Sequence, residues 1–477
     1  MVERTPTLLG GKWISDGPVA ERVGPYLRTV VSAARIAEPG DARAAAEYAR
    51  ASARTIACLA PATRAAVLDR ASALAVERRD AIARLLALEL GKPLRDGRGE
   101  LDRVADTFAV CAAEARAIGG DLLPVAGWAR GVGNTALTYR APAGVALAIT
   151  PFNAPANLLA HKLGASFAAG NSTIVKAPPQ APAVSAAVVA LLLDAGAPVE
   201  AVQLLHGGGE VGAELCAAPE VAVISFTGSA ETGAAVARAA GAKRLVLELG
   251  GNAATIVCDD ADLEQAAQVC ARTGYSNSGQ SCISVQRIYV DRRRKDRFVE
   301  LLTAEVKRLR VGDPLDPTTD VGSMVDDAAA ERVQKWATTS GGEITVGGRR
   351  DGATLSPTVV VDPPEYAEVV VKEVFGALVT VLPFDDFDAV LERCNASSFG
   401  LQAGLFTNDA GRIFRAWREL EVGGLIVNGS SNYRLDHVPF GGVKDSGFGR
   451  EDPRHMVEDY TVVKTLILRG LSIWGEN

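Results

Sequence analysis

Five short apolar runs alternate with helical segments between residues 144 and 251, and this alternation constrains the fold more than any other feature of the sequence. The runs are "GVALAIT" (144–150), "NSTIVK" (171–176), "AVQLLH" (201–206), "VAVISFTG" (221–228) and "RLVLELGG" (244–251). Strands that alternate with helices in this way predict a doubly wound parallel sheet. Such sheets bind ligands beyond the carboxyl ends of their strands, so polar residues at those ends are the candidates for a site.

A second series of strand-like and helical segments runs from about residue 253 to residue 430. The chain has 477 residues, which is more than one hydrophobic core usually serves. Helical patterns occupy residues 41–118, and a glycine-rich stretch at 120–140 is typical of an extended hairpin. The sequence therefore predicts two α/β units and a projecting arm, which the tail "VEDYTVVKTLILRG" would complete as a strand.

Charge and cysteine content argue against several classes of function. The formal net charge of −7 disfavours a nucleic-acid partner held by bulk charge. The seven cysteines are scattered, odd in number and without a C-x-x-C pair, so they indicate neither a disulfide framework nor a metal site. The start "MVERTPTLLG" has no apolar signal core, and no run is long enough to cross a membrane. We expect a cytoplasmic protein with no nucleic-acid or membrane partner.

One cysteine, Cys282, lies in the polar stretch "SNSGQSCISVQR" (276–287). A structural cysteine is usually buried among apolar side chains, whereas a reactive one lies where donors can stabilise its thiolate. Here a glycine-containing turn precedes a strand-like run, so free backbone N–H groups could hold a thiolate or an oxyanion. This context favours a nucleophile over a packing residue.

Two residues at strand ends could assist such a nucleophile. Glu248, in "LELGG", ends an apolar run, where desolvation could raise its pKa and make it a general base. It could equally be a solvated carboxylate or a helix cap. Asn153, in "ITPFNAP", lies between two prolines that stiffen the loop, so its amide could donate to an oxyanion or simply cap the next helix. Each signal is weak by itself.

Two other strand ends suit a nucleotide. Lys176, in "IVKAPPQAP", would place an ammonium group where a ribose or a phosphate could lie, although one solvated lysine among many is the plain alternative. The segment "SFTGSAETG" (225–233) runs from a strand into a helix start, where free N–H groups and the helix dipole suit a phosphate. It lacks the G-x-G-x-x-G fingerprint and is weak evidence alone.

Taken in order, the motifs resemble the aldehyde dehydrogenase superfamily over essentially the whole chain. They are "TPFNAPANLLAHKLGASFAAGNSTIVK", "FTGSAETG", "LELGGNAATIV", "YSNSGQSC", "KEVFGALVTV" and "PFGGVKDSGFGRE". The local patterns look most like the branch that oxidises lactaldehyde, succinic semialdehyde, phosphonoacetaldehyde and phosphonoformaldehyde. The resemblance implies a Rossmann-type NAD(P)-binding domain (1–120 and 142–252), an α/β catalytic domain (253–430) and a small β oligomerisation arm (121–141 and 456–477).

The resemblance also implies a role for each matching residue. Cys282 would attack the aldehyde to form a thiohemiacetal, whose oxyanion Asn153 and the backbone N–H of Cys282 would stabilise. After hydride transfer to NAD or NADP, Glu248 would activate the water that hydrolyses the thioester. Lys176 would contact the adenosine ribose, with Glu373 and Phe375 at the nicotinamide ribose and ring. The residues expected at the cofactor are Thr150, Pro151, Phe152, Lys176, Pro179, Gly207, Phe226, Thr227, Gly228, Ser229, Leu249, Gly250, Glu373 and Phe375.

The chain departs from the family pattern at two positions. Many members read Lys-Pro-x-Glu where this chain has "KAPP", so Pro179 replaces the carboxylate that would grip the adenosine ribose. Loss of that carboxylate relaxes the preference for NAD and admits NADP, and since no arginine appears there, both cofactors stay open. "FGAL" replaces a commoner Phe-Gly-Pro, and we expect Ala377 to have little catalytic effect.

The substrate is expected to be a small anionic or hydroxylated aldehyde. Only 5% of the residues are aromatic, which disfavours a tunnel for large hydrophobic aldehydes. Arg434 and His437, in "NYRLDHVPFGG", precede a motif expected near the substrate entrance, and an arginine there suits a carboxylate or a phosphonate. His161 and Arg103 could join them, although each could instead serve in a salt bridge or in helix packing. Ser281 stands where some anion-specific relatives carry arginine, which weakens the phosphonate alternative.

Two other functions share parts of this pattern. A coenzyme-A-acylating dehydrogenase would release the thioester to coenzyme A, but the presence of Glu248 argues for hydrolysis. A non-catalytic scaffold would be expected to lose Cys282 or Glu248, and both are present. The arm would expose long strand edges that need a partner, so we expect a homodimer or a homotetramer.

Overall fold

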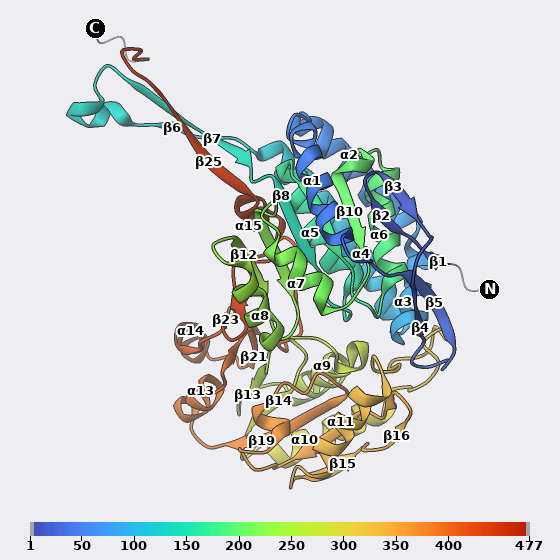
Figure 1. Cartoon of the computed structure of the whole chain (residues 1–477). Helices are drawn as coiled ribbons and strands as arrows, with labels where there is room; N and C mark the ends of the chain where they lie inside the picture. The colour runs from blue at the N-terminus through green and yellow to red at the C-terminus, as the bar shows by residue number, and fades with distance from the viewer. Residues whose placement is uncertain (1–3, 474–477) are drawn as a thin grey trace.

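The computed structural model describes residues 4–473 of the chain. Figure 1 shows two lobes and a long thin arm that projects from the first of them. Each lobe is built around its own mixed sheet, one of eight strands and one of seven. The predicted α/β class, with two sheets and an arm, is confirmed.

The eight-stranded sheet has the strand order β24-β12-β11-β8-β9-β10-β2-β3. Its five central strands are parallel and correspond to the five runs predicted from the sequence. They are β8 (Val145–Ile149), β9 (Ser172–Lys176), β10 (Val202–Leu205), β11 (Val223–Thr227) and β12 (Arg244–Glu248). Antiparallel strands β2 (Thr7–Leu9), β3 (Lys12–Ile14) and β24 (Gly447–Phe448) complete its edges. The chain order reverses between β8 and β11, which is where sheets of this type bind ligands.

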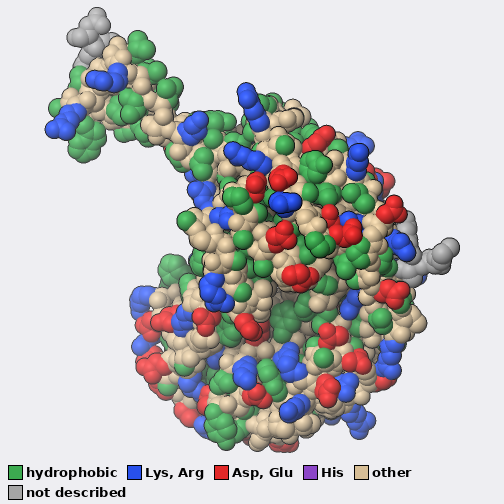
Figure 2. All heavy atoms as spheres, viewed as in Figure 1, with side chains coloured by type: hydrophobic (Ala, Val, Ile, Leu, Met, Phe, Trp, Pro, Cys, Tyr) green, Lys and Arg blue, Asp and Glu red, His purple; other side chains and the backbone are tan. Residues whose placement is uncertain are grey.

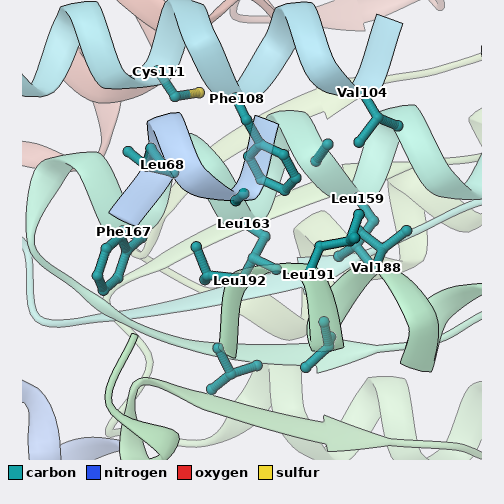
Figure 3. Packing of buried hydrophobic residues seen from close by; sticks show 14 of the residues in the cluster. Leu68, Val104, Phe108, Cys111, Leu159, Leu163, Phe167, Val188, Leu191 and Leu192 are labelled. Carbon is teal, nitrogen blue, oxygen red and sulfur yellow. The ribbon is translucent and has the colours of Figure 1, made fainter. Parts of the chain in front are cut away.

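Helices cover both faces of this sheet. Alternate residues of a strand point to opposite faces, and in β8 Ala146 and Ala148 belong to one hydrophobic core while Val145 and Leu147 belong to another. Figure 3 shows the first of these cores, where α2, α4, α5 and α6 meet. The helices of this lobe are α1 (Asp41–Ala57), α2 (Pro61–Glu77), α3 (Arg79–Leu90), α4 (Leu94–Ala117), α5 (Pro155–Ala169), α6 (Pro182–Asp194), α7 (Gly209–Ala217), α8 (Ala230–Ala240) and α15 (Pro453–Asp459).

The second lobe contains the seven-stranded sheet, with the order β15-β18-β19-β14-β13-β21-β22. Its strands are β13 (Ala254–Val257), β14 (Arg287–Asp291), β15 (Glu343–Val346), β18 (Thr358–Val361), β19 (Leu378–Phe384), β21 (Gln402–Phe406) and β22 (Gly424–Val427). All neighbouring pairs are parallel except β15 with β18. Its helices are α9 (Leu263–Gly274), α10 (Lys295–Arg308), α11 (Asp327–Thr338), α12 (Glu368–Val371), α13 (Phe387–Asn395) and α14 (Ala410–Glu419).

Short elements complete the structure. A three-stranded sheet pairs β1 (Arg4–Thr5), β5 (Val30–Arg35) and β4 (Val19–Val23), and two small hairpin-like pairs join β16 (Arg350–Asp351) to β17 (Thr354–Leu355) and β20 (Phe399–Gly400) to β23 (Val443–Lys444). The 3₁₀ turns are η1 (Val125–Gly127), η2 (Ala129–Gly131), η3 (Val199–Ala201) and η4 (Ser276–Gly279). No helix in residues 4–473 is both long and apolar enough to span a membrane.

The arm is a three-stranded sheet of β6 (Leu122–Leu123), β7 (Thr135–Pro142) and β25 (Thr461–Leu468), in the order β25-β7-β6. Apolar side chains gather on its surface in Figure 2. The predicted arm segment 456–477 starts too early, because Met456, Val457 and Tyr460 are buried in the core of the first lobe. Residues 1–3 and 474–477, which the predicted domain boundaries include, lie outside the described part.

Candidate active site

A cleft of about 960 Å³ opens at the switch point of the eight-stranded sheet. Asn153 and Cys282 both line it. Every residue that the sequence predicts at the cofactor also lines it except Gly207, whose neighbours Gly208 and Gly209 are on the wall instead. The cleft therefore brings together residues that are far apart in the chain, from Ile149 to Phe375.

The loop before Cys282 has an unusual backbone. Asn277 and Ser278 have φ values of 51° and 56°, in the left-handed region that non-glycine residues rarely adopt, and Gly279 follows with φ 72°. Gly279 has no alternative, because a Cβ there would lie 2.0 Å from the carbonyl oxygen of Gly376. Such a conformation persists only when its surroundings fix it, and here Asp96 accepts the Asn277 N–H at 2.7 Å.

The amide of Asn153 faces this loop. Its Nδ2 donates to the carbonyl oxygen of Gln280 at 3.1 Å, which leaves its second N–H free. The carbonyl oxygen of Asn153 accepts from Lys92 Nζ at 2.6 Å and from Asn277 Nδ2 at 3.0 Å. The backbone N–H of Cys282 has no acceptor within residues 4–473. Two N–H donors are thus available beside the thiol, and several hydrogen bonds fix one of them in place.

The thiol of Cys282 lies in an apolar setting beside Ile283, Leu401 and Phe440. Burial, together with the negative charges of Glu373 and Glu248, raises the pKa of Cys282 to about 12. The resting side chain is therefore a neutral thiol rather than a thiolate. It needs a base when it attacks an electrophile.

Glu248 is a buried carboxyl group close enough to this thiol to affect its pKa. Its side chain ends β12 and is only 2% exposed, and neither carboxylate oxygen has a hydrogen-bond partner in the described part of the chain. Burial, and to a lesser extent repulsion from Glu451, raises the pKa of Glu248 well above the ordinary carboxyl value. A Cβ on Gly441 would lie 2.8 Å from its Oε1, so glycine at 441 leaves room for this carboxylate.

Glu451 lies in the same interior and is fully paired. Its carboxylate accepts from Lys162 Nζ at 2.7 Å, from Arg434 Nη1 at 3.1 Å and from Thr227 Oγ1 at 3.1 Å. Burial opposes its charge, but Lys162 and Arg434 outweigh that effect and lower the pKa of Glu451 to about 2. The pKa values of these two close carboxyl groups are therefore shifted in opposite directions.

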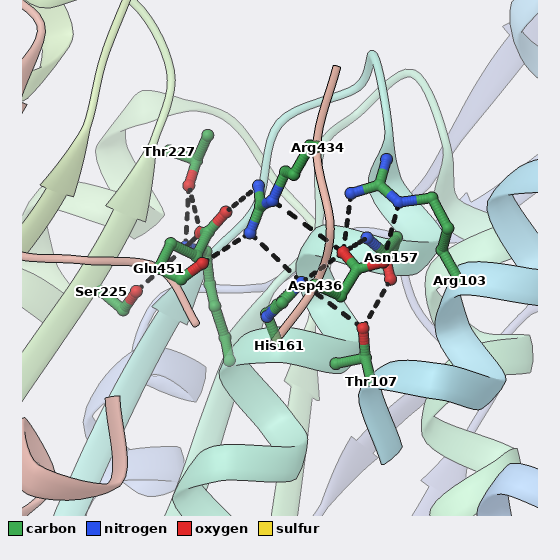
Figure 4. A network of polar contacts seen from close by, with 10 residues as sticks. Arg103, Thr107, Asn157, His161, Ser225, Thr227, Arg434, Asp436 and Glu451 are labelled. Carbon is green, nitrogen blue, oxygen red and sulfur yellow. Dashed lines mark hydrogen bonds and ion pairs between the residues drawn. The ribbon is translucent and has the colours of Figure 1, made fainter. Parts of the chain in front are cut away.

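A second carboxylate, Asp436, anchors the other half of the network in Figure 4. It accepts two hydrogen bonds from Arg103, at 2.7 and 2.9 Å, and one from Asn157 Nδ2 at 3.0 Å. His161 Nε2 lies 2.9 Å from the same carboxylate and 3.2 Å from Arg434 Nη2. Burial opposes the charge of Asp436, but His161 and Arg103 overcome it and hold its pKa far below the usual range.

The substrate residues predicted from the sequence are placed unequally. Arg434, His161 and Arg103 share this network, and the Arg434 guanidinium stacks 4.1 Å from the ring centre of Phe440, which in turn packs by Cys282. Both terminal nitrogens of Arg434 already bond to Glu451 or His161, while its Nε is buried without a partner in residues 4–473. His437 is exposed and stands apart from the network. Ser281, half-buried, adjoins Cys282.

The cleft has the features that a dinucleotide needs. Lys176 is 8% exposed, lines the cleft and has no hydrogen-bond or ion-pair partner in the described residues, so its ammonium group is available to a ligand. Glu373 Oε1 accepts from the Gly251 N–H at 2.8 Å, and burial raises the pKa of Glu373 to about 7. Phe152 and Phe375 meet edge to face, with ring centres 5.8 Å apart. The residues present therefore fit NAD or NADP.

Sequence reasoning missed the roles of Lys162, Glu451 and Asp436. Lys162 lies in an apolar stretch of α5, and a lysine that faces the interior of such a helix must have a buried partner. That signal could have marked Lys162 as unusual. It could not have identified Glu451, which lies 289 positions further along the chain. Arg332, which lines the cleft and donates to the Val374 carbonyl at 2.9 Å, was also missed.

Comparison with known proteins gives a consistent result. The model of the aldehyde dehydrogenase family matches residues 13–466. A 3-sulfolactaldehyde dehydrogenase from Priestia aryabhattai is 40% identical over 464 residues, which cover 96% of this chain and 97% of the relative.

Two solved structures have the same fold. Aldehyde dehydrogenase 21 from Physcomitrella patens, in complex with its reaction product succinate, superposes with a TM-score of 0.96 at 33% identity, covering 99% of this chain and 100% of that one. Glyceraldehyde-3-phosphate dehydrogenase from Methanocaldococcus jannaschii, complexed with NADP, has a TM-score of 0.91 at 32% identity, covering 96% and 100%.

Proposed function

The chain belongs to the aldehyde dehydrogenase family, and on that premise we propose that it oxidises a small anionic aldehyde of the 3-sulfolactaldehyde type to the carboxylic acid. It is an NAD(P)-dependent aldehyde dehydrogenase that acts on a small-molecule aldehyde. The proposal concerns which aldehyde it takes and which residues act on it.

One observation carries the choice of an anionic substrate, namely the excess of positive charge beside Cys282. The buried network holds three cations, Arg103, Lys162 and Arg434, against the two carboxylates Glu451 and Asp436. Burial raises the pKa values of Glu248 and Cys282 and so disfavours their charged forms, which lowers how far these two groups can offset this excess. Lys162 and Arg434 are buried and Arg103 is partly exposed, and the one unmatched positive charge of the network favours an anion nearby, which a sulfonate or carboxylate on the substrate would supply.

The hydroxylated character of the substrate has weaker support. The Ser281 hydroxyl is half-buried beside Cys282, so it could bond to a hydroxyl group next to the aldehyde carbon. The relative from Priestia is named for a substrate that carries both a hydroxyl and a sulfonate group. We therefore favour 3-sulfolactaldehyde over succinic semialdehyde, lactaldehyde and the phosphonate aldehydes.

In the proposed mechanism, the Cys282 thiol gives its proton to water in the open cleft as its sulfur adds to the aldehyde carbon and forms a thiohemiacetal. The free N–H of Asn153 and the backbone N–H of Cys282 stabilise the resulting oxyanion. The dinucleotide, when bound in the cleft, supplies a hydride acceptor. Glu248, buried and without a hydrogen-bond partner in residues 4–473, takes a proton from the water that hydrolyses the Cys282 thioester. Its raised pKa brings its protonation equilibrium closer to neutral pH, where such a base is most effective.

The same geometry supports hydrolysis over transfer to coenzyme A. A buried carboxyl group with free oxygens near the thioester is suited to activating the water that hydrolyses it. Stoichiometric formation of the free acid in the absence of coenzyme A is therefore expected. A strict requirement for coenzyme A would favour the acylating alternative.

Arg434→Gln should lower the preference of the enzyme for anionic aldehydes. Hydrogen bonds to a charged group contribute about 1.5–3 kcal/mol, so kcat/KM for 3-sulfolactaldehyde should fall about 10- to 100-fold relative to kcat/KM for propanal. The ratio of the two kcat/KM values is the quantity to compare, because any effect that Arg434 has through Glu451 changes the turnover of both aldehydes alike. Steady-state formation of reduced cofactor measures it.

The matched control is Arg454→Gln, which removes the same charge from an exposed arginine of α15 whose ion pair, in residues 4–473, is with Glu458 at 3.9 Å. It should leave the ratio unchanged. If Arg434→Gln also left the ratio unchanged, the anionic-substrate proposal would be wrong. Better turnover of propanal than of every anionic aldehyde by the unmodified enzyme would contradict it as well.

The arm supports a homodimer or a homotetramer. Trp128, Val463, Leu466 and Ile467 are each more than half exposed on it, and β25 is an edge strand. Light scattering should therefore give the mass of two or four chains, and a monomer would contradict the assignment of the arm to oligomerisation. All seven cysteines are free, as in proteins of reducing compartments, which supports a cytoplasmic location.

A further inference from the structure

A carboxylate that the sequence motifs did not point to lies against the cleft-lining residue Gly208. Glu210 lies in the first turn of α7, directly after β10. Its Oε1 accepts the N–H of Gly208 at 3.1 Å, so the side chain folds back over the helix start. Gly208 and Gly209 line the cleft, as does Lys176 at the end of the neighbouring strand β9. The carboxylate is thus held at the rim of the cleft beside the lysine expected at the ribose.

Lys176 and Glu210 act on each other through space. Burial lowers the pKa of Lys176, and the charge of Glu210 opposes that shift. No other charged group contributes resolvably to Lys176 in the described residues. The Glu210 carboxylate therefore occupies the Gly208 N–H at the start of α7 and acts electrostatically on the nearby Lys176 ammonium group, two features that would otherwise attract an extra phosphate.

We propose that Glu210 selects NAD over NADP, supplying from the start of α7 the carboxylate that Pro179 lacks at the end of β9. This inference rests on the proposed function only in that a dinucleotide occupies the cleft with its adenosine ribose by Lys176. A carboxylate beside that ribose accepts hydrogen bonds from the 2′- and 3′-hydroxyl groups of NAD. The same carboxylate repels the 2′-phosphate of NADP. Two like charges in contact weaken binding, so the affinity for NADP should be several-fold to many-fold lower than that for NAD.

Other charged side chains line the cleft on the α8 side. Glu231 lies in the first turn of α8 and would add to the repulsion of a phosphate, whereas Arg238, near the other end of α8, would attract one. Neither is among the groups that shift the pKa of Lys176. Glu210 is the carboxylate that is both fixed by a backbone N–H and coupled to the lysine, so it should dominate the discrimination.

The test measures the binding of NAD and of NADP by isothermal titration calorimetry on the full chain without aldehyde. The unmodified protein should bind NAD about tenfold or more tightly than NADP. Glu210→Gln keeps an oxygen for the Gly208 N–H but removes the charge. NADP should therefore bind more tightly to this variant, and the dissociation constants of NAD and NADP should differ by no more than about twofold to threefold. Glu214→Gln, one turn further along α7 and exposed, removes the same charge away from the cleft and should keep the original ratio.

Two results would overturn the inference, namely a preference of the unmodified protein for NADP, or a ratio that Glu210→Gln does not change. Because no aldehyde is present, failure of the proposed substrate class cannot produce either result. That failure would appear separately, as poor turnover of anionic aldehydes by a protein that still discriminates between the two dinucleotides.

Discussion

Cys282→Ser should abolish aldehyde oxidation, with kcat falling by about 10⁴-fold or more. The thiol lies in the cleft wall with Asn153, and the Asn153 amide and the backbone N–H of Cys282 are both available as donors. A serine hydroxyl fits the same space but is a far weaker nucleophile and a poorer leaving group in the acyl intermediate. Formation of reduced cofactor with saturating aldehyde measures the loss.

The control is Cys58→Ser, which alters an exposed cysteine and should keep full activity. Dinucleotide binding and the melting temperature of Cys282→Ser should also stay unchanged, because the neutral thiol makes no hydrogen bond that serine would disturb. Substantial turnover by Cys282→Ser would show that another residue is the nucleophile.

Glu248→Gln should lower kcat by about 10²- to 10⁴-fold, the usual contribution of a general base. The variant should fold normally, since Glu248 favours its protonated form and an uncharged amide of the same shape resembles that form. Because the loss falls on thioester hydrolysis, a first turnover of reduced cofactor should still be visible as a burst. Stopped-flow absorbance distinguishes this burst from the slow steady state.

The pH profile gives a second test of Glu248. Its folded-state pKa is raised, so the ionised form that can accept a proton becomes populated only as pH rises above the ordinary carboxyl range. The steady-state kcat of the unmodified enzyme should therefore increase with pH through this raised value. The Glu248→Gln variant should lack that increase. An unchanged kcat, or the same pH profile in both proteins, would exclude Glu248 as the hydrolytic base.

Much of the fold follows from local patterns. The strands β8 to β12 were predicted because buried parallel strands consist of short apolar runs bounded by loops, and that signal needs no knowledge of distant residues. The boundary of the arm was misplaced for the opposite reason. Met456, Val457 and Tyr460 continue directly into β25, and only their packing in the first lobe separates them from it.

The site, too, has residues that local sequence patterns predict and residues that only the folded structure reveals. Cys282, Asn153 and Glu248 each follow a recognisable strand or turn, so sequence placed them as candidates, and the structure gathers the predicted cofactor residues around one cleft except Gly207. The partners of the buried charges were not predictable. Lys162 meets Glu451, and Arg103 meets Asp436 across 333 positions, and neither pairing leaves a local pattern. Glu210 was likewise not predictable, because no sequence pattern distinguishes it from the many other exposed acidic residues.

The most direct test of the account is the intact mass of Glu248→Gln after mixing with NAD and 3-sulfolactaldehyde. If Cys282 carries the acyl group and Glu248 drives its hydrolysis, the mass should rise by one sulfolactoyl group, and peptide mapping should place the addition on Cys282. Introducing Cys282→Ser as well should remove the adduct. An unmodified mass during continued formation of reduced cofactor, or an adduct that persists without Cys282, would contradict the central claim.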